Sequence, residues 1–244
     1  MRPLAGMPEV TEGADLGALI AASAAPSDGE IVVVSQKVVS KAEGRVRRLD
    51  GVKPSARARE LAEKTEKDPA LVELVLAESH SVLRAAPGVL IVETNDGWIC
   101  ANAGIDSSNL PGDGGAVALL PVDADASARR IRAEIGAAAG SAPAVVVADS
   151  FGRPWRLGQA DVAIGCAGIT AIDDWRGRRD AQGGELSATA ISVADQAAGA
   201  ADLVREKDSA VPGAVISGLD RLVTLEDGPG AKAQQRPEAE DLFR

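Results

Sequence analysis

The run APAVVVADS at residues 142–150 decides the fold class of this chain. Its apolar centre predicts a buried strand, and the polar residues Asp149 and Ser150 come at the strand's end. Active-site residues often lie at strand ends, on loops that a rigid sheet holds in place, and a carboxylate there can hold a metal ion. The alternative is an ordinary turn in which Asp149 forms an ion pair with a nearby arginine.

The turn after this strand carries further candidate groups. Residues 151–165 read FGRPWRLGQADVAIG, in which a glycine and a proline shape a turn. Arg153 and Arg156 can grip a phosphate or a carboxylate, and Trp155 offers a flat apolar face. An aromatic residue in this turn attracts attention because the chain has only three tryptophans, two phenylalanines and no tyrosine.

Short apolar runs alternate with helical patterns along the rest of the chain. This alternation predicts a mixed α/β fold, although the strand order cannot be derived from it. The predicted strands are residues 30–39, 88–94 and 97–101 (a hairpin), 116–121, 162–168 and 214–219. The predicted helices are residues 54–66, a helix that begins at Pro69 and includes His80 and Val82, residues 125–139, and residues 186–204.

Composition excludes several classes of protein. The 244 residues carry 36 acidic and 26 basic side chains, and this net charge of −10 argues against nonspecific nucleic-acid binding. No apolar run is long enough to span a membrane, and the N-terminus lacks the apolar core of a signal peptide. Cys100 and Cys166 do not make a disulfide framework. We expect a reduced, cytoplasmic protein with one domain over residues 1–225 and a flexible tail or linker over residues 226–244.

Two further segments could bind phosphate and metal. The first, SQKVVSKAEGR at residues 35–45, places Lys37 and Lys41 beyond a strand end, where lysines can bind phosphate oxygens. The second, ANAGIDSSN at residues 101–109, contains Asp106, which could be one of the few carboxylates that Mg²⁺ takes beside substrate phosphates. The alternatives are ordinary surface lysines and an Asx-turn.

The available side chains narrow the chemistry. His80 is the only histidine, no zinc-ligand spacing occurs, and no Walker loop is present. Carboxylates, lysines and arginines remain, and these favour metal-assisted phosphate chemistry.

Five motifs of this chain, taken together and in order, resemble those of the coenzyme F420-0:L-glutamate ligase family, the gamma-glutamyl ligases. They are GMPEV, SQKVVSKAEGR, ANAGIDSSN, ADSFGRPWRLGQADVAIGCAG and DDWRGRRD. This family also occurs as the N-terminal domain of a longer, fused actinobacterial protein. The resemblance runs from about residue 3 to residue 223. The C-terminal RPEAEDLFR resembles the linker before a flavin-binding domain in fused relatives, so the chain is either a stand-alone form or an excised domain.

The resemblance implies a GTP-dependent ligase that joins L-glutamate to coenzyme F420-0 and releases GDP and phosphate. It implies a requirement for Mg²⁺ or Mn²⁺, stimulation by K⁺, a family-specific fold, and a homodimer with the active site near the subunit interface. Carried over by motif, the metal ligands are Asp106, Asp149, Ser150 and Glu206. The residues implied to bind the nucleotide are Met7, Pro8, Glu9, Val10, Lys37, Lys41 and Asn109.

The chemistry of the reaction suggests roles for the arginines and leaves two rival functions. Arg153 or Arg156 could hold a carboxylate or a phosphate in a bidentate grip during catalysis. One rival is another NTP-dependent carboxylate–amine ligase, and the other is a nucleotide-binding module without turnover. Neither the number of glutamates added nor the physiological metal can be read from the sequence.

Overall fold

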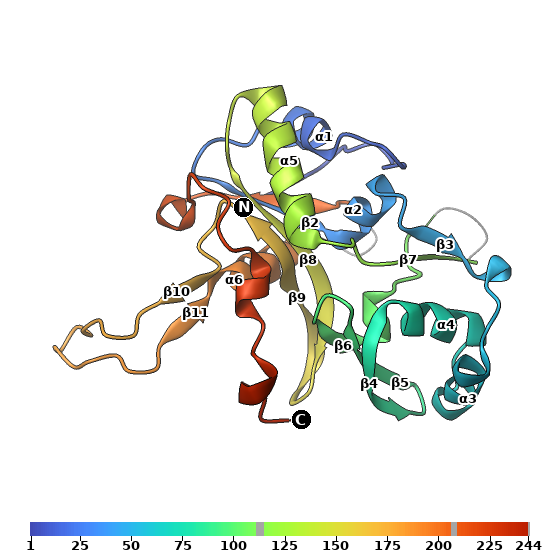
Figure 1. The fold of residues 1–244 in the computed structure, drawn as a ribbon. Helices are drawn as coiled ribbons and strands as arrows, with labels where there is room; N and C mark the ends of the chain where they lie inside the picture. The colour runs from blue at the N-terminus through green and yellow to red at the C-terminus, as the bar shows by residue number, and fades with distance from the viewer. Residues whose placement is uncertain (111–114, 206–208, 244) are drawn as a thin grey trace.

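A five-stranded sheet forms the centre of the computed structural model, which describes residues 1–110, 115–205 and 209–243 (Figure 1). Across the sheet, the strands run in the order β1 (Arg2–Pro3), β12 (Gly213–Ile216), β2 (Ile31–Ser35), β8 (Ala144–Arg153) and β9 (Arg156–Ala167). β2 and β8 are parallel, and the other neighbouring pairs of this sheet are antiparallel. The predicted α/β class is confirmed.

Helices cover both faces of this sheet, which explains why its central strands are continuously apolar. Val145 and Val147 of β8 pack with α1 (Leu16–Ala24) and α5 (Ala124–Ala139) on one face. Val146, between them, packs with α6 (Val193–Asp202) on the other. Successive side chains of a strand point to opposite faces, so each residue of the run has an apolar partner.

A smaller lobe packs around its own apolar core at the lower right of Figure 1. It contains α3 (Ala56–Thr65), α4 (Pro69–Ala77) and an antiparallel sheet of β4 (Ser79–Ala86), β5 (Val89–Thr94) and β6 (Ile99–Ala101). The predicted hairpin of residues 88–94 and 97–101 is confirmed as β5 and β6. The chain enters this lobe through β3 (Val46–Arg48) and leaves it through β7 (Ala116–Ala118), which pair with each other.

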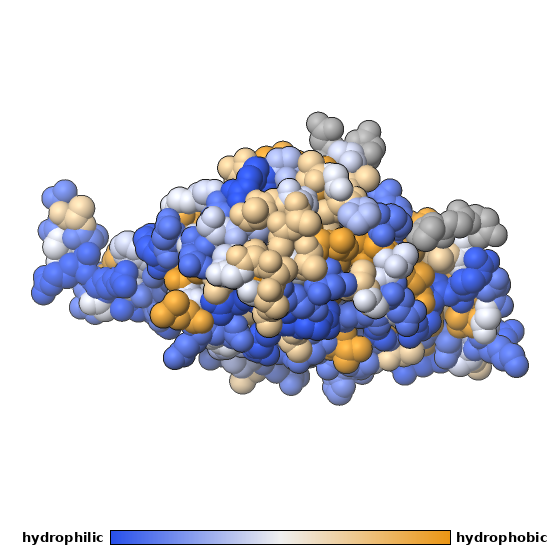
Figure 2. Space-filling view, turned by 90° about the horizontal axis from the view of Figure 1, so that it is seen from above, coloured by the Kyte–Doolittle hydropathy of each residue, from blue (hydrophilic) through white to orange (hydrophobic). Residues whose placement is uncertain are grey.

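Strands β10 (Ile172–Asp174) and β11 (Ala190–Ser192) form the base of an arm that projects to the left in Figure 1. The surface of this arm is largely hydrophilic at the left of Figure 2. Its loop carries Trp175, and the guanidinium carbon of Arg178 lies 4.9 Å from the centre of the Trp175 ring.

The predicted strand over residues 30–39 is wrong in its second half. The strand ends at Ser35, and Gln36–Ala42 form helix α2. Ser35 begins this helix because its hydroxyl accepts a hydrogen bond from the backbone N–H of Lys37. Val38 and Val39 therefore belong to a helix, and an apolar run alone does not distinguish the two structures.

Two predicted helices are too long. Residues 190–192 of the predicted helix 186–204 are strand β11, and the helix begins only at Val193. His80 and Val82, predicted to continue the helix from Pro69, lie on β4 because that helix ends at Ala77. Strand pairing with β10 and with β5 overrides the helical preference of both segments.

Strand lengths also differ from the predictions. β8 and β9 together form one long hairpin, so the predicted turn after Ser150 is reduced to the tip around Trp155. The predicted strands 116–121 and 214–219 are shorter, as Ala116–Ala118 and Gly213–Ile216.

The first part of the segment expected to be a tail packs against the sheet. Ala231 is fully buried, and its N–H donates a 2.7 Å hydrogen bond to the carboxylate of Asp125 on α5. Arg132, also on α5, forms an ion pair of 2.8 Å with Asp227. Residues 227–231 are thus held to the domain by buried groups.

Both cysteines, Cys100 and Cys166, are buried and free. Among the helices of the described ranges, none combines the length and the apolarity needed to cross a bilayer.

Candidate functional site

A cavity of about 880 Å³ lies at the carboxyl ends of the parallel strands β2 and β8. Ligand sites of α/β sheets commonly occupy this position, because loops diverge there from neighbouring strand ends. Segments far apart in the sequence supply the lining, namely residues within 7–10, 35–41, 100–109, 148–161 and 202–212.

Asp149 lies on the cavity wall directly after the last residue of β8 that pairs with β2, which is Ala148. Desolvation, together with the nearby negative charges of Asp161 and Asp106, raises the pKa of Asp149 to about 7. A carboxylate in this environment gains from a cation that balances its charge. Ser150 lines the same cavity and donates its hydroxyl hydrogen to Asp161 over 2.6 Å.

Asp106 reaches the cavity from the segment after β6. Its carboxylate lies 2.8 Å from the ammonium of Lys37 and accepts a 2.7 Å hydrogen bond from the backbone N–H of Ser108. Burial alone would raise the pKa of Asp106, but the hydrogen bonds from Lys37 and Ser108 lower it below its ordinary value. Asp106 therefore does form the Asx-turn hydrogen bond of the alternative interpretation. The same carboxylate also forms an ion pair with Lys37.

Lys41 is nearly buried on α2, with 9% of its side chain exposed. Its ammonium lies 2.6 Å from the carboxylate of Glu9 and donates a 3.2 Å hydrogen bond to the backbone oxygen of Asn109. Lys41 is thus not an ordinary surface lysine. Its contacts connect α2 to the two other segments expected to bind a nucleotide, which contain Glu9 and Asn109.

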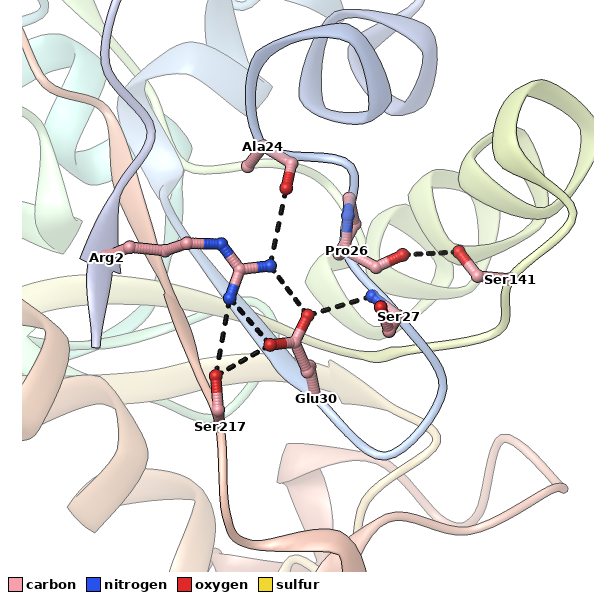
Figure 3. A network of polar contacts seen from close by, with 7 residues as sticks. All are labelled: Arg2, Ala24, Pro26, Ser27, Glu30, Ser141 and Ser217. Carbon is pink, nitrogen blue, oxygen red and sulfur yellow. Dashed lines mark hydrogen bonds and ion pairs between the residues drawn. The ribbon is translucent and has the colours of Figure 1, made fainter.

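The N-terminal segment is tethered to the sheet on its way to the cavity (Figure 3). The guanidinium of Arg2 donates to both carboxylate oxygens of Glu30, over 2.6 and 2.7 Å, and Ser217 donates to the same carboxylate over 2.6 Å. The next residues pair with β12, and the backbone N–H of Leu4 donates to Gly213. This anchoring brings residues 7–10 to the cavity wall, where Met7, Pro8, Glu9 and Val10 all line it.

Arg153 and Arg156 do not line this cavity. They are exposed at the tip of the β8–β9 hairpin, where Arg153 donates to the backbone oxygen of Leu157. Trp155 at the same tip contacts Phe243, with ring centres 5.7 Å apart. Within one chain, the two arginines are separate from the groups around Asp149.

Two site residues were missed by sequence reasoning. Asp161 on β9 and Arg205 after α6 both line the cavity, and their side chains form a buried ion pair. A possible signal for Asp161 was a lone acidic residue at the start of the apolar run VAIGCA. The partner of that residue could not be read from the sequence, because Arg205 comes from a segment more than forty positions away.

The donor set suits a hard divalent cation. Asp106, Asp149 and Ser150 offer carboxylate and hydroxyl oxygens on one cavity, and Mg²⁺ is commonly bound by one or two carboxylates together with substrate phosphates. In the part of the chain that the structure describes, no group of three His, Cys, Asp or Glu side chains could hold a metal alone. Glu206, the fourth expected ligand, lies outside the described residues.

Comparisons with known proteins give a consistent match. The family model described as F420-0:Gamma-glutamyl ligase matches residues 6–218. A protein named coenzyme F420:L-glutamate ligase from Methanothermobacter thermautotrophicus is 42% identical over 98% of this chain and 96% of its own length. Proteins of the same name from Methanopyrus kandleri and Haloarcula marismortui are 41% and 42% identical, over 97% and 98% of this chain and 94% and 93% of their own lengths.

The matched region contains the whole wall of the cavity described above. Identity of this size over nearly the full length of several relatives leaves no large part of the chain outside the shared sequence. The chain therefore belongs to the F420-0:gamma-glutamyl ligase family, a family of ligase enzymes.

Proposed function

We propose that this protein joins L-glutamate to coenzyme F420-0 through an amide bond, with GTP as the co-substrate and a divalent cation, Mg²⁺ or Mn²⁺, at the site. The names of the relatives support the reaction, and the cavity supports the chemistry. The observation that carries the proposal is that one cavity brings together the carboxylates of Asp106 and Asp149, which come from separate segments, and two lysines of α2, Lys37 and Lys41. Carboxylates suit a cation and lysines suit the phosphates that it binds.

The reaction needs an activated carboxylate, because oxide is a very poor leaving group. In the proposed sequence, a carboxylate oxygen of F420-0 attacks the γ-phosphorus of GTP, and the bond to the β-phosphate oxygen breaks to release GDP. The amine of glutamate then attacks the carbonyl carbon of the acyl phosphate. The carbon–oxygen bond to phosphate breaks, phosphate leaves, and the amine loses a proton to give the amide.

The residues of the cavity divide this work. Lys37 and Lys41 bind and orient phosphate oxygens, and both are held in place by ion pairs on two sides of the site. Asp106, Asp149 and Ser150 would hold the cation, which would neutralise negative charge on the transferring phosphoryl group. Met7, Pro8, Glu9, Val10 and Asn109 surround the space expected for the nucleotide. K⁺ stimulation stays a prediction.

We also propose that the protein works as a homodimer. At the tip of the β8–β9 hairpin, Trp155 is 76% exposed and Leu157 is 99% exposed, so the tip presents two large apolar side chains to a partner. In this proposal the tip packs against a second copy and brings Arg153 and Arg156 to that copy's cavity. A light-scattering mass of one chain at working concentration would reject the dimer.

Mass spectrometry of the deazaflavin tests the ligase activity. Incubation of F420-0 with protein, GTP, Mn²⁺ and L-glutamate should add the mass of one or more glutamyl residues. Omission of glutamate, or replacement of GTP by ATP, is the control and should leave the mass largely unchanged. GTP hydrolysis without a change in the deazaflavin would favour a different acceptor, and tight GTP binding without GDP release would favour a non-catalytic module.

A further inference from the structure

Asp161 and Arg205 form a buried ion pair directly behind Ser150. Asp161 on β9 is the cross-strand neighbour of Ser150 on β8, and only 1% of its side chain is exposed. The guanidinium of Arg205, 8% exposed, donates to one oxygen of Asp161 and, over 3.2 Å, to Asp202 on α6. The positive charge of Arg205 lies against the negative charge of this buried carboxylate, so neither charge is left without a counter-charge.

The second oxygen of Asp161 accepts the hydroxyl hydrogen of Ser150 over 2.6 Å. A serine hydroxyl has one hydrogen and two lone pairs. Once its hydrogen is donated to Asp161, the hydroxyl can present only lone pairs to a ligand in the cavity. Asp161 therefore fixes the orientation of the Ser150 hydroxyl, so that its oxygen lone pairs, and not its hydrogen, are available to a ligand in the cavity.

We propose that Asp161 and Arg205 are positioning residues that hold the hydroxyl oxygen of Ser150 as a ligand for a divalent cation. The inference rests on the proposed function, which places the cation at Asp106, Asp149 and Ser150. In this proposal Asp161 acts behind Ser150 and not as a ligand: only 1% of its side chain is exposed, and Ser150 and Arg205 each donate to one of its oxygens. Oriented contacts behind a metal ligand commonly tune metal affinity in this way.

The substitution Asp161→Asn keeps the shape of the side chain but reverses the direction of its hydrogen bond with Ser150. A guanidinium can only donate hydrogen bonds, so the amide oxygen of the new side chain must face Arg205. The amide N–H group then faces Ser150 and occupies a lone pair of the hydroxyl oxygen. The hydroxyl hydrogen has to turn away from Asn, toward the place of the cation, where it repels positive charge.

Binding of Mn²⁺ alone, followed by the loss of the electron paramagnetic resonance signal of free Mn²⁺, tests the inference without turnover. Asp161→Asn should weaken Mn²⁺ binding by about 10- to 100-fold. Ser150→Ala should weaken it as well, and Asp161→Asn added to Ser150→Ala should cause no further loss, since Asp161 acts through Ser150. A purely structural role of Asp161 would instead make the two losses multiply.

A double variant, Asp161→Asn with Arg205→Met, provides the matched control. Without the guanidinium, the amide can rotate and accept the hydrogen of Ser150 again. The two charges of the Asp161–Arg205 pair are removed together, and Asp202, which is partly exposed, loses its contact with Arg205. Mn²⁺ affinity should return toward that of the parent protein. This variant also carries the test if Asp161→Asn alone does not fold, which melting curves of all variants will show.

The outcomes separate the inference from the proposed function. If Ser150→Ala weakens Mn²⁺ binding but Asp161→Asn binds like the parent, the inference is rejected and the cation site stands. The inference is also rejected if the losses of Mn²⁺ affinity in Ser150→Ala and Asp161→Asn multiply when the two substitutions are combined. It is rejected as well if Asp161→Asn with Arg205→Met binds Mn²⁺ as poorly as Ser150→Ala. A parent protein that binds no Mn²⁺ would reject the cation site, and the inference with it.

Discussion

The ammonium nitrogen of Lys37 lies 2.8 Å from a carboxylate oxygen of Asp106 and 2.6 Å from the hydroxyl oxygen of Ser108. A residue proposed to bind phosphate and a residue proposed to bind a cation are therefore each other's counter-charge in this structure. A bound nucleotide with its cation would replace both partners at once, Lys37 turning to phosphate and Asp106 to the cation. The ion pair between Lys37 and Asp106 balances these two charges and competes with each ligand when it binds alone.

Lys37→Met should have opposite effects on the two ligands. Nucleotide binding should weaken by about 10-fold or more, because a charge-assisted contact to phosphate is lost. Mn²⁺ alone should bind as tightly as before or more tightly, since the ammonium beside Asp106 no longer repels it. Calorimetric titration of each ligand checks this, with the exposed Lys53→Met as control. Equal weakening of both ligands would contradict the proposed exchange of partners.

Lys41→Ala should weaken nucleotide binding by about 10- to 150-fold, which corresponds to roughly 1.5–3 kcal/mol for a contact between a charged donor and a partly desolvated phosphate. The side chain is nearly buried, so water cannot easily take its place. Equilibrium binding of a fluorescent GTP analogue measures the effect, and Lys53→Ala is the matched control. An unchanged dissociation constant would mean that Lys41 serves only to hold Glu9.

Asp149→Asn should abolish ligation and weaken Mn²⁺ binding, while the protein without metal stays as stable as the parent or becomes more stable. The reason is that burial and two nearby carboxylates disfavour the charged form of Asp149, whose pKa is raised to about 7. The amide has nearly the same shape and carries no charge. Melting curves and Mn²⁺ titrations are compared with those of Asp50→Asn, an exposed control. A lower melting temperature with parent-like metal affinity would reject the ligand assignment and give Asp149 a structural role.

Arg2→Ala should make the protein less stable near pH 7 and have less effect in acid. The hydrogen bonds from Arg2 lower the pKa of Glu30 from 4.5 to about 2. A lowered pKa stabilises the fold above the unfolded value, and this contribution is lost as the pH falls from about 4.5 toward 2. Because 40% of the Arg2 side chain is exposed, we expect only about 1–2 kcal/mol at pH 7.

Urea unfolding at pH 7 and at pH 3 measures this difference. The exposed pair of Arg48 and Asp50 supplies the control, and Arg48→Ala should leave the unfolding free energy nearly unchanged at both pH values. A destabilisation by Arg2→Ala that is equal at both pH values would show that packing, rather than the ion pair with Glu30, holds the N-terminal strand.

Mixing of inactive subunits tests whether Arg156 serves the cavity of a second copy. Arg156→Ala and Asp149→Asn should each be inactive alone, and a mixture that is unfolded and refolded together should regain activity. In the hybrid dimer, one cavity then has an intact Asp149 from one chain and an intact Arg156 from the other. If Arg156 acted on its own chain's cavity, every site of the hybrid would keep a defect and the mixture would remain inactive.

The sequence predicted the elements whose burial leaves a clear pattern. The apolar runs around Val145 and Val33 became central strands because both of their faces are covered. The predicted ends of strands and helices were wrong where a side-chain hydrogen bond or pairing with another strand determined the local structure. Ser35 ended a strand by beginning a helix, and pairing with β10 converted residues 190–192 to a strand. These outcomes depend on distant partners or on a single side-chain hydrogen bond, and a local pattern contains neither.

Only part of the candidate site could be predicted from the sequence. Asp106, Asp149, Lys37 and Lys41 were found by motif, and the structure brings all four to one cavity. Asp161 and Arg205 were not found, because their importance lies in a pairing between β9 and the end of α6. The strand order that creates the cavity also lay beyond the sequence pattern.

The place of β12 between β1 and β2 has a consequence for the order of events in folding. The N-terminal strand has no neighbour in the sheet until residues 213–216 have been synthesised and inserted beside β2. Contacts between such distant parts of a chain form slowly, because a long loop must close first. Until β12 has been inserted, residues 7–10 therefore lack the sheet anchor that precedes them in the chain. Ligand affinity should be gained at the end of folding, which makes nucleotide binding a report on whether a molecule has completed its fold.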